Sequence, residues 1–177
     1  SSGQGTQPFL AYLSFYSVHT PLMGRPDLVE KYTKKAEAIT GEEFADEETV
    51  WGEEQRKVRI LQKHPVYAAM VEAMDLAVGK VLAQLDALGL AENTIVIFTS
   101  DNGGLSTSEG WPTSNLPLRG GKGWMYEGGI RTFGLLRWPG HVEAGRRDET
   151  SVTGGVDFLP TICKLTGVDV PATLQPD

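Results

Sequence analysis

The chain of 177 residues has the composition of an ordinary globular protein, with 40% apolar and 22% charged residues. Sixteen basic and 23 acidic side chains give a net charge of -7, which argues against broad nucleic-acid binding because such binding needs a basic face. No apolar run approaches the roughly 20 residues that span a bilayer, so the sequence predicts no transmembrane helix. The single cysteine, Cys163, excludes an intrachain disulfide and a multi-cysteine zinc site.

The first predicted element is a strand over residues 9–16, whose nearly continuous hydrophobicity indicates burial on both faces. The chain opens with Ser1 and reaches this apolar run within a few residues, so we expect a fragment of something longer. Residues 27–64 are polar, and we interpret them as a solvated, helical excursion with no binding role. This segment carries an acidic cluster made of Glu42, Glu43, Asp46, Glu47 and Glu48.

The clearest predicted helix begins at Pro65, because apolar residues recur at spacings of three and four as far as Leu88, before Gly89. A β-branched run over residues 93–99 predicts a buried strand. A further strand over residues 132–138 and a helix over 156–165 follow. A helix, a short loop and a buried strand in this order are typical of parallel α/β proteins. We therefore predict an α/β fold with a central, mostly parallel sheet and helices on both faces, incomplete at the N-terminus.

Polar residues follow directly after the strand over 93–99, where ligands gather in parallel α/β sheets. Asp101 and Asn102 offer a carboxylate and an amide oxygen, which are hard donors suited to Ca²⁺ or Mg²⁺. Gly103 and Gly104 would let the backbone approach a ligand closely. All four residues also favour turns, so an ordinary turn is the alternative interpretation.

Two further candidates, a lysine and a histidine, complete the pattern. Lys122 stands among glycines in a long loop over residues 102–129, where an ammonium group can serve as a point charge for an oxyanion. The loop does not match a phosphate-binding Walker motif, which needs Ser or Thr where this chain has Gly123. His19 follows the first strand and is either a functional group or a hydrogen-bonded structural histidine. Cys163 lies in an apolar stretch and is interpreted as a small core residue.

Several motifs occur together in a fixed order. They are VHTPL at 18–22, NTIVIFTSDNGG at 93–104, LRGGKGWMYEGGIR at 118–131 and RWPG at 137–140. With these motifs, most of residues 8–167 resembles the formylglycine-dependent sulfatases of the alkaline-phosphatase superfamily. The resemblance implies an alkaline-phosphatase-like fold, with residues 1–177 forming part of a sulfatase catalytic domain and residues 102–129 its active-site loop.

Site roles also follow from the resemblance. Asp101 and Asn102 would be metal ligands, with Ca²⁺ favoured and Mg²⁺ the alternative. Lys122 and His19 would bind the sulfate and act as catalytic residues, with His19 helping to protonate the leaving oxygen. The expected substrate is a sulfate ester, above all a sulfated carbohydrate. The resemblance further implies a periplasmic or secreted protein, while the charge balance and the short apolar runs predict no nucleic-acid partner and no membrane span.

The family's nucleophile, formylglycine (3-oxoalanine), is made from the Cys or Ser of a C/S-x-P-x-R motif, and these 177 residues contain none. Cys163 is followed by Lys-Leu-Thr and does not fit. We therefore expect a C-terminal portion of the catalytic domain that is inactive alone. The alternatives are a phosphate mono- or diester hydrolase of the same superfamily, a non-catalytic glycan- or polyanion-binding module in which Trp111 and Trp124 stack on sugars, and a structural domain.

Overall fold

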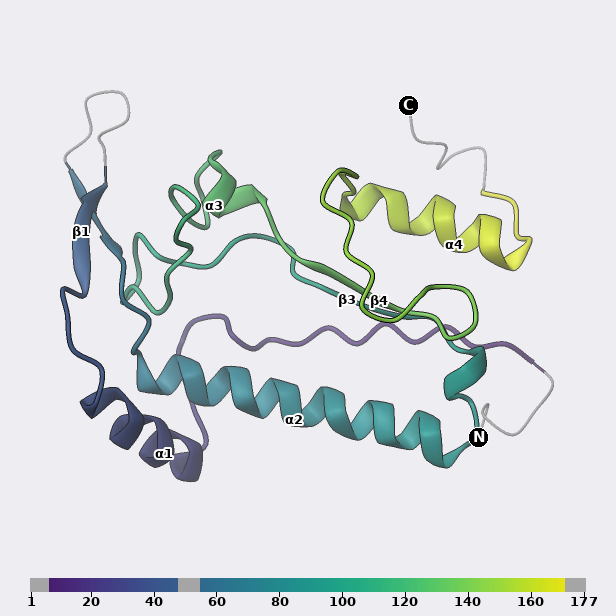
Figure 1. Ribbon diagram of the computed structural model, residues 1–177, viewed down its shortest axis with the longest axis horizontal. Coiled ribbons are helices and arrows are strands. Elements are labelled where there is room, and N and C mark those ends of the chain that lie inside the picture. The colour runs from purple at the N-terminus through teal and green to yellow at the C-terminus, as the bar shows by residue number, and fades with distance from the viewer. Residues whose placement is uncertain (1–6, 48–54, 171–177) are drawn as a thin grey trace. The chain divides into compact units, whose positions relative to one another are not determined.

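The computed structural model describes residues 7–47 and 55–170, which fall into two compact units, 1–141 and 142–177 (Figure 1). Within the described part, the first unit contains α1 (Pro26–Glu37), β1 (Phe44–Glu47), β2 (Arg56–Arg59), α2 (Pro65–Ala87), β3 (Val96–Thr99), α3 (Glu127–Ile130) and β4 (Gly134–Arg137). The second unit contains α4 (Phe158–Thr166). Short 3-10 turns at Ala91–Asn93 and Gly155–Asp157 lead into β3 and α4.

The helix predicted from residue 65 is confirmed as α2, which has 23 residues. Pro65 occupies its first turn, where the missing N–H costs nothing. The His64 side chain caps this end, because its Nδ1 accepts a 3.3 Å hydrogen bond from the Tyr67 N–H. At the other end Gly89 adopts a left-handed φ of 68°, as its place after the helix predicts.

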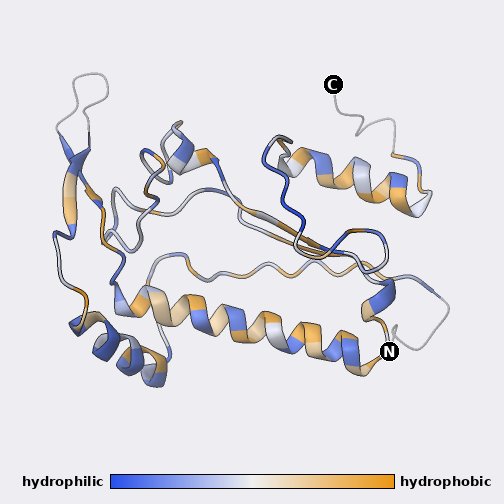
Figure 2. Ribbon diagram, in the orientation of Figure 1, coloured by the Kyte–Doolittle hydropathy of each residue, from blue (hydrophilic) through white to orange (hydrophobic). Residues whose placement is uncertain are grey.

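Helix α1 packs against α2, and this contact contains much of the described core. Leu28 of α1 is buried, as are Ala69 and Met70 of α2. At the rim, the Lys31 ammonium lies 2.7 Å from a Glu72 carboxylate oxygen. Figure 2 shows that α1 is mostly hydrophilic, whereas apolar residues recur along α2. An amphipathic α1 therefore covers one side of a more apolar α2.

The polar segment over residues 27–64 is helical only in its first part. After α1, strands β1 and β2 pair antiparallel, with Phe44 opposite Arg59 and Glu47 opposite Arg56. The acidic residues of one strand face the basic residues of the other, which favours cross-strand pairing. Glu43, just before β1, accepts a 3.2 Å contact from the nearly buried Arg59 guanidinium. The helical interpretation is therefore wrong for residues 44–47 and 56–59. Acidic residues on the first strand and basic residues on the second favour their pairing as antiparallel strands.

Two predicted strands are confirmed as β3 and β4, but the predicted burial of the strand over 93–99 is wrong, because Ile97 is 40% exposed. Their arrangement also differs from the prediction. They pair with each other antiparallel, with Thr99 opposite Gly134. Between them lie a long loop and the four-residue helix α3, which is too short for the crossover that parallel neighbours need. In the described residues both sheets are two-stranded and antiparallel, and a central parallel sheet is not confirmed.

The predicted strand over residues 9–16 is not assigned as a strand. Its side chains are open to solvent, with exposed fractions of 78% at Leu10 and 90% at Tyr12. A strand is defined by its hydrogen-bonded neighbour, and among the described residues this run pairs with none.

The second unit contains the predicted C-terminal helix as α4. The Asp157 carboxylate accepts a 2.6 Å hydrogen bond from the Gly154 N–H at its start, and Gly167 ends it with a φ of 69°. Cys163 is 8% exposed, which confirms the interpretation as a small buried residue. Across the described ranges of both units, no helix is both long and apolar enough to cross a membrane.

Candidate functional site

The turn over residues 101–104 begins two residues after β3 ends. The Ser100 hydroxyl donates a 3.0 Å hydrogen bond to the Asn102 carbonyl, and the Gly103 N–H donates a 2.8 Å bond to the Gly129 carbonyl. Asp101 is exposed and Asn102 is half-buried. The carboxylate and amide thus stand on a turn that is bonded to the end of α3.

The glycines of this turn are needed for contact with the protein's own backbone. A Cβ on Gly103 would overlap the Gly128 carbonyl, and a Cβ on Gly104 would lie 2.7 Å from the Asn115 Oδ1. The sequence predicts that these glycines leave room for a ligand. The structure fills that room with α3 and with the Asn115 side chain, so the glycines serve close packing.

The loop that carries Lys122 is bonded to the same turn. The Lys122 N–H donates a 3.0 Å hydrogen bond to the carbonyl of Gly104, and Gly104 lies two residues after Asn102 in the chain. The buried Ser106 hydroxyl donates a 3.0 Å bond to the Gly120 carbonyl. The candidate metal-ligand turn and the candidate sulfate-binding loop therefore form one hydrogen-bonded assembly.

Asn115 joins the two parts of that assembly, and sequence reasoning did not identify it. Its Oδ1 accepts a 3.1 Å bond from the Gly104 N–H, and its Nδ2 donates to the Gly104 carbonyl at 2.8 Å. The same Nδ2 reaches the Ser106 Oγ at 3.0 Å and the Gly120 carbonyl at 3.1 Å. Asparagine in a polar loop gives no sequence signal for this role, because only the folded loop supplies the partners.

His19 is exposed, and its orientation is set by its own turn. Its Nδ1 lies 2.7 Å from the Thr20 carbonyl, and because a carbonyl only accepts, Nδ1 carries the proton. The Thr20 hydroxyl donates a 3.0 Å bond to the Glu109 carboxylate. The turn that bears His19 is thus attached to the long loop after β3, while convergence of the His19 and Lys122 side chains stays a prediction.

Trp111 is used for internal packing. Its indole N–H donates a 2.7 Å bond to the Lys57 carbonyl on β2, and its ring meets Phe44 edge to face at 6.2 Å between centroids. The Arg59 guanidinium also bonds to the Trp111 carbonyl. Trp111 is half-buried, and its indole N–H is used inside the protein, whereas the binding-module alternative uses this side chain for a sugar.

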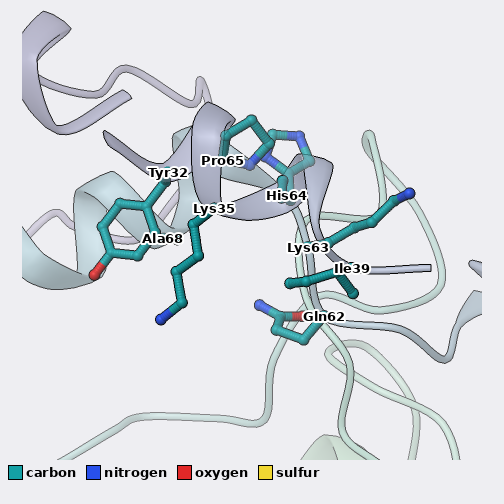
Figure 3. A pocket seen from close by; sticks show the side chains of 9 residues that line it. Tyr32, Lys35, Ile39, Gln62, Lys63, His64, Pro65 and Ala68 are labelled. Atoms are coloured by element: carbon teal, nitrogen blue, oxygen red, sulfur yellow. The ribbon is translucent and has the colours of Figure 1, made fainter. Parts of the chain in front are cut away.

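A cavity of about 180 Å³ lies between α1 and the start of α2 (Figure 3). None of the four candidate site residues lines it. Of its two lysines, Lys63 is paired with Glu43 at 2.7 Å, and Figure 3 shows its ammonium group pointing away from that of Lys35. His64 also lines it, and burial together with nearby Arg59 lowers the pKa of that imidazole. The cavity has no concentrated charge that would select a ligand.

The chemistry of the donors decides what cation the site suits. Asp101 and Asn102 provide hard oxygen ligands, as Ca²⁺ and Mg²⁺ prefer. Over residues 7–47 and 55–170, no three His, Cys, Asp or Glu side chains come together. Asp101 and Asn102 have the oxygen donors that suit a hard divalent cation. They would supply two of the six or more ligands that Ca²⁺ takes.

Comparison with known proteins decides the family. The family model described as Sulfatase matches residues 2–168. The chain belongs to the sulfatase family. It is 36% identical to a sulfatase of Formosa agariphila and 38% identical to the steryl-sulfatase of Rattus norvegicus, each over 93% of this chain.

A solved structure agrees with this assignment. Ps i-CgsB in complex with k-i-k-neocarrahexaose matches 99% of the chain with a TM-score of 0.76 and 30% identity. The chain spans 33% of that structure and about a quarter of the two curated relatives, 27% and 24%. The match supports the alkaline-phosphatase-like fold of sulfatases for this part.

Proposed function

We propose that this chain forms part of a sulfatase that hydrolyses sulfate esters, with Asp101 and Asn102 holding a divalent cation and Lys122 and His19 acting on the sulfate. The observation that carries the proposal is the direct bond from the Lys122 N–H to the Gly104 carbonyl, within the turn that presents Asn102. One sulfate must touch the metal, the lysine and the histidine together, so these elements need a fixed relation.

Lys122 stabilises negative charge on the sulfate oxygens as the ester bond breaks. Its backbone is held by the Gly104 carbonyl, so little reorganisation is needed at the moment of reaction. The side chain is half-buried, which strengthens its interaction with an anion relative to bulk water. An ammonium group has three donors and suits a tetrahedral anion as a point charge.

His19 acts on the leaving oxygen. The Nδ1 proton is already committed to the Thr20 carbonyl, so Nε2 is the nitrogen that faces other partners. In the protonated imidazole, Nε2–H donates to the ester oxygen and transfers its proton as that oxygen departs. The Thr20–Nδ1 hydrogen bond holds the ring in this orientation throughout.

Two groups outside these side chains complete the chemistry. The divalent cation, when bound, polarises the sulfate oxygens and lowers the pKa of the nucleophile. Formylglycine is the family's covalent nucleophile, and we propose that its precursor lies in sequence outside these 177 residues. The 177-residue chain alone then hydrolyses no sulfate ester.

We propose a sulfated carbohydrate as the substrate class, and Ca²⁺ as the cation. Support for the carbohydrate comes from the neocarrahexaose complex of the similar Ps i-CgsB. A periplasmic or secreted location belongs to the same proposal and rests on the family resemblance. Separation of periplasm, medium and cytoplasm from the source cells, followed by immunodetection, tests it.

The experiment that tests the reaction is sulfate and phosphate release by the complete protein with Ca²⁺. Matched sulfate and phosphate monoesters of one chromogenic alcohol serve as substrates. We expect sulfate release, and losses of at least a hundredfold in kcat/KM for Lys122→Ala and Asp101→Ala, because each removes a group that acts on developing charge. Lys80→Ala, on the exposed side of α2, serves as the control.

Two results would overturn the proposal. Faster turnover of the phosphate ester would assign the protein to phosphoryl transfer. Wild-type activity of both Lys122→Ala and Asp101→Ala, with Lys80→Ala also active, would remove the assigned site. Circular dichroism of every variant separates lost folding from lost chemistry.

A further inference from the structure

The acidic end of β1 reaches the loop that carries Lys122. The Glu47 Oε2 accepts a 3.2 Å hydrogen bond from the Gly120 N–H, two residues before Lys122. The Glu47 Oε1 lies 3.7 Å from the Arg119 Nε. The Glu47 carboxylate thus contacts two consecutive residues, Arg119 and Gly120, just before Lys122.

Both polar groups of the Gly120 backbone are satisfied by side chains. Glu47 takes the N–H, while Ser106 and Asn115 donate to the carbonyl at 3.0 and 3.1 Å. Gly120 is buried and has a φ of 70°, a conformation that costs other residues free energy. Hydrogen bonds to both its N–H and its carbonyl hold this buried residue in place, and they set the direction in which the chain continues toward Lys122.

The Glu47 contact has the features of a positioning interaction. Its side chain is 12% exposed, so its hydrogen bond is shielded from water. A charged acceptor strengthens the bond from a neutral N–H. The neighbouring Arg119 guanidinium also lies 3.9 Å from the Tyr126 ring centroid, which anchors the same end of the loop. By contrast, Asp46 on the same strand is exposed and faces Lys57 at 3.9 Å.

We propose that Glu47 is a positioning residue for sulfate binding, which acts through Gly120 by holding Lys122 in its productive place. The inference rests on the proposed role of Lys122. It gives the polar segment over residues 27–64 a function, since the β1–β2 hairpin then serves as a support for the Lys122 loop.

The test is calorimetric titration of inorganic sulfate into the complete protein at a fixed Ca²⁺ concentration, with Glu47→Ala, Glu47→Gln, Asp46→Ala and Lys122→Ala. We expect Glu47→Ala to weaken sulfate binding about tenfold, because the buried Gly120 N–H loses its acceptor. Glu47→Gln keeps an acceptor oxygen, so we expect it to weaken sulfate binding less. It replaces the alanine variant in the test if that variant does not fold. Asp46→Ala, the matched control, binds sulfate like the wild type.

A double-mutant cycle separates positioning from general stability. If Glu47 acts through Lys122, Glu47→Ala has no further effect on sulfate affinity in a Lys122→Ala background. An equal loss in both backgrounds would overturn the inference, and so would unchanged affinity in both Glu47 variants. If Lys122→Ala itself binds sulfate normally, the proposed function fails together with this inference. If Lys122→Ala weakens binding and Glu47→Ala does not, only the inference fails.

Discussion

Replacement of Asn115 by alanine should release the loop that carries Lys122 from the turn that carries Asn102. The change removes hydrogen bonds to the Gly104 N–H, the Gly104 carbonyl, the Ser106 Oγ and the Gly120 carbonyl. Because Nδ2 has two hydrogens for its three acceptors, the change costs the equivalent of three bonds; each contributes a net 0.5–1.5 kcal/mol, so the local loss is about 2–4 kcal/mol. At 1.4 kcal/mol per tenfold, local opening becomes about thirty- to several-hundred-fold more frequent.

Hydrogen exchange measured by mass spectrometry on the complete protein tests this magnitude. The amides of Gly104 and Lys122 should lose protection by that factor in Asn115→Ala, since both lie in the released assembly. Peptides from α2 should exchange as in the wild type. Ser108→Ala, in the same loop, is the matched control. Unchanged exchange over residues 101–123 in Asn115→Ala would refute the reasoning, because the amide would then be dispensable for joining the two parts.

Two glycines should respond to alanine with opposite signs. Gly128→Ala should destabilise by about 1–3 kcal/mol, because its Cβ would overlap the Arg119 and Gly120 carbonyls, whereas Gly79→Ala in open space on α2 should stabilise by about 0.5–1 kcal/mol. Thermal unfolding measures both, and equal midpoints would contradict the packing described. His64 predicts a pH dependence: its pKa lies below the ordinary 6.5, so the unfolded chain binds the proton more readily and stability falls as pH drops below about 6.5. His64→Gln should flatten the change in midpoint between pH 7.5 and 5.5, and an identical slope would exclude His64 as its source.

Local pattern was sufficient for the elements whose stability is local. The helix from Pro65 was predictable because its apolar spacing, first-turn proline and terminal Gly89 are all readable along the chain. The strands over 93–99 and 132–138 were likewise readable from β-branched and apolar runs. Their antiparallel pairing was not, because the direction of a strand depends on how the chain between them returns.

Elements that depend on distant partners were missed for the same physical reason. The β1–β2 hairpin forms between two charged runs that each look like a solvated helix face by themselves. Residues 9–16 have the hydrophobicity of a buried strand, yet the described residues supply no neighbour to hydrogen-bond with them. Hydrophobicity predicts burial, but only a partner makes a strand.

The candidate site divides in the same way. Asp101, Asn102, Lys122 and His19 could be named as candidates because their residue types suit the chemistry and their motifs resemble those of a family. Asn115 and Glu47 carry no such signal, since a loop asparagine and one acid among several are common. Their proposed roles rest on the backbone groups that they contact, which only the fold reveals.

The most direct test of the account is a crystal structure of the complete protein with Ca²⁺ and inorganic sulfate. We expect the Asp101 and Asn102 oxygens about 2.3–2.6 Å from the cation. We also expect the Lys122 Nζ and the His19 Nε2 within about 3.2 Å of oxygens of one sulfate. A His19 side chain that does not reach the sulfate bound by Lys122, or a cation bound without Asp101 and Asn102, would contradict this expectation.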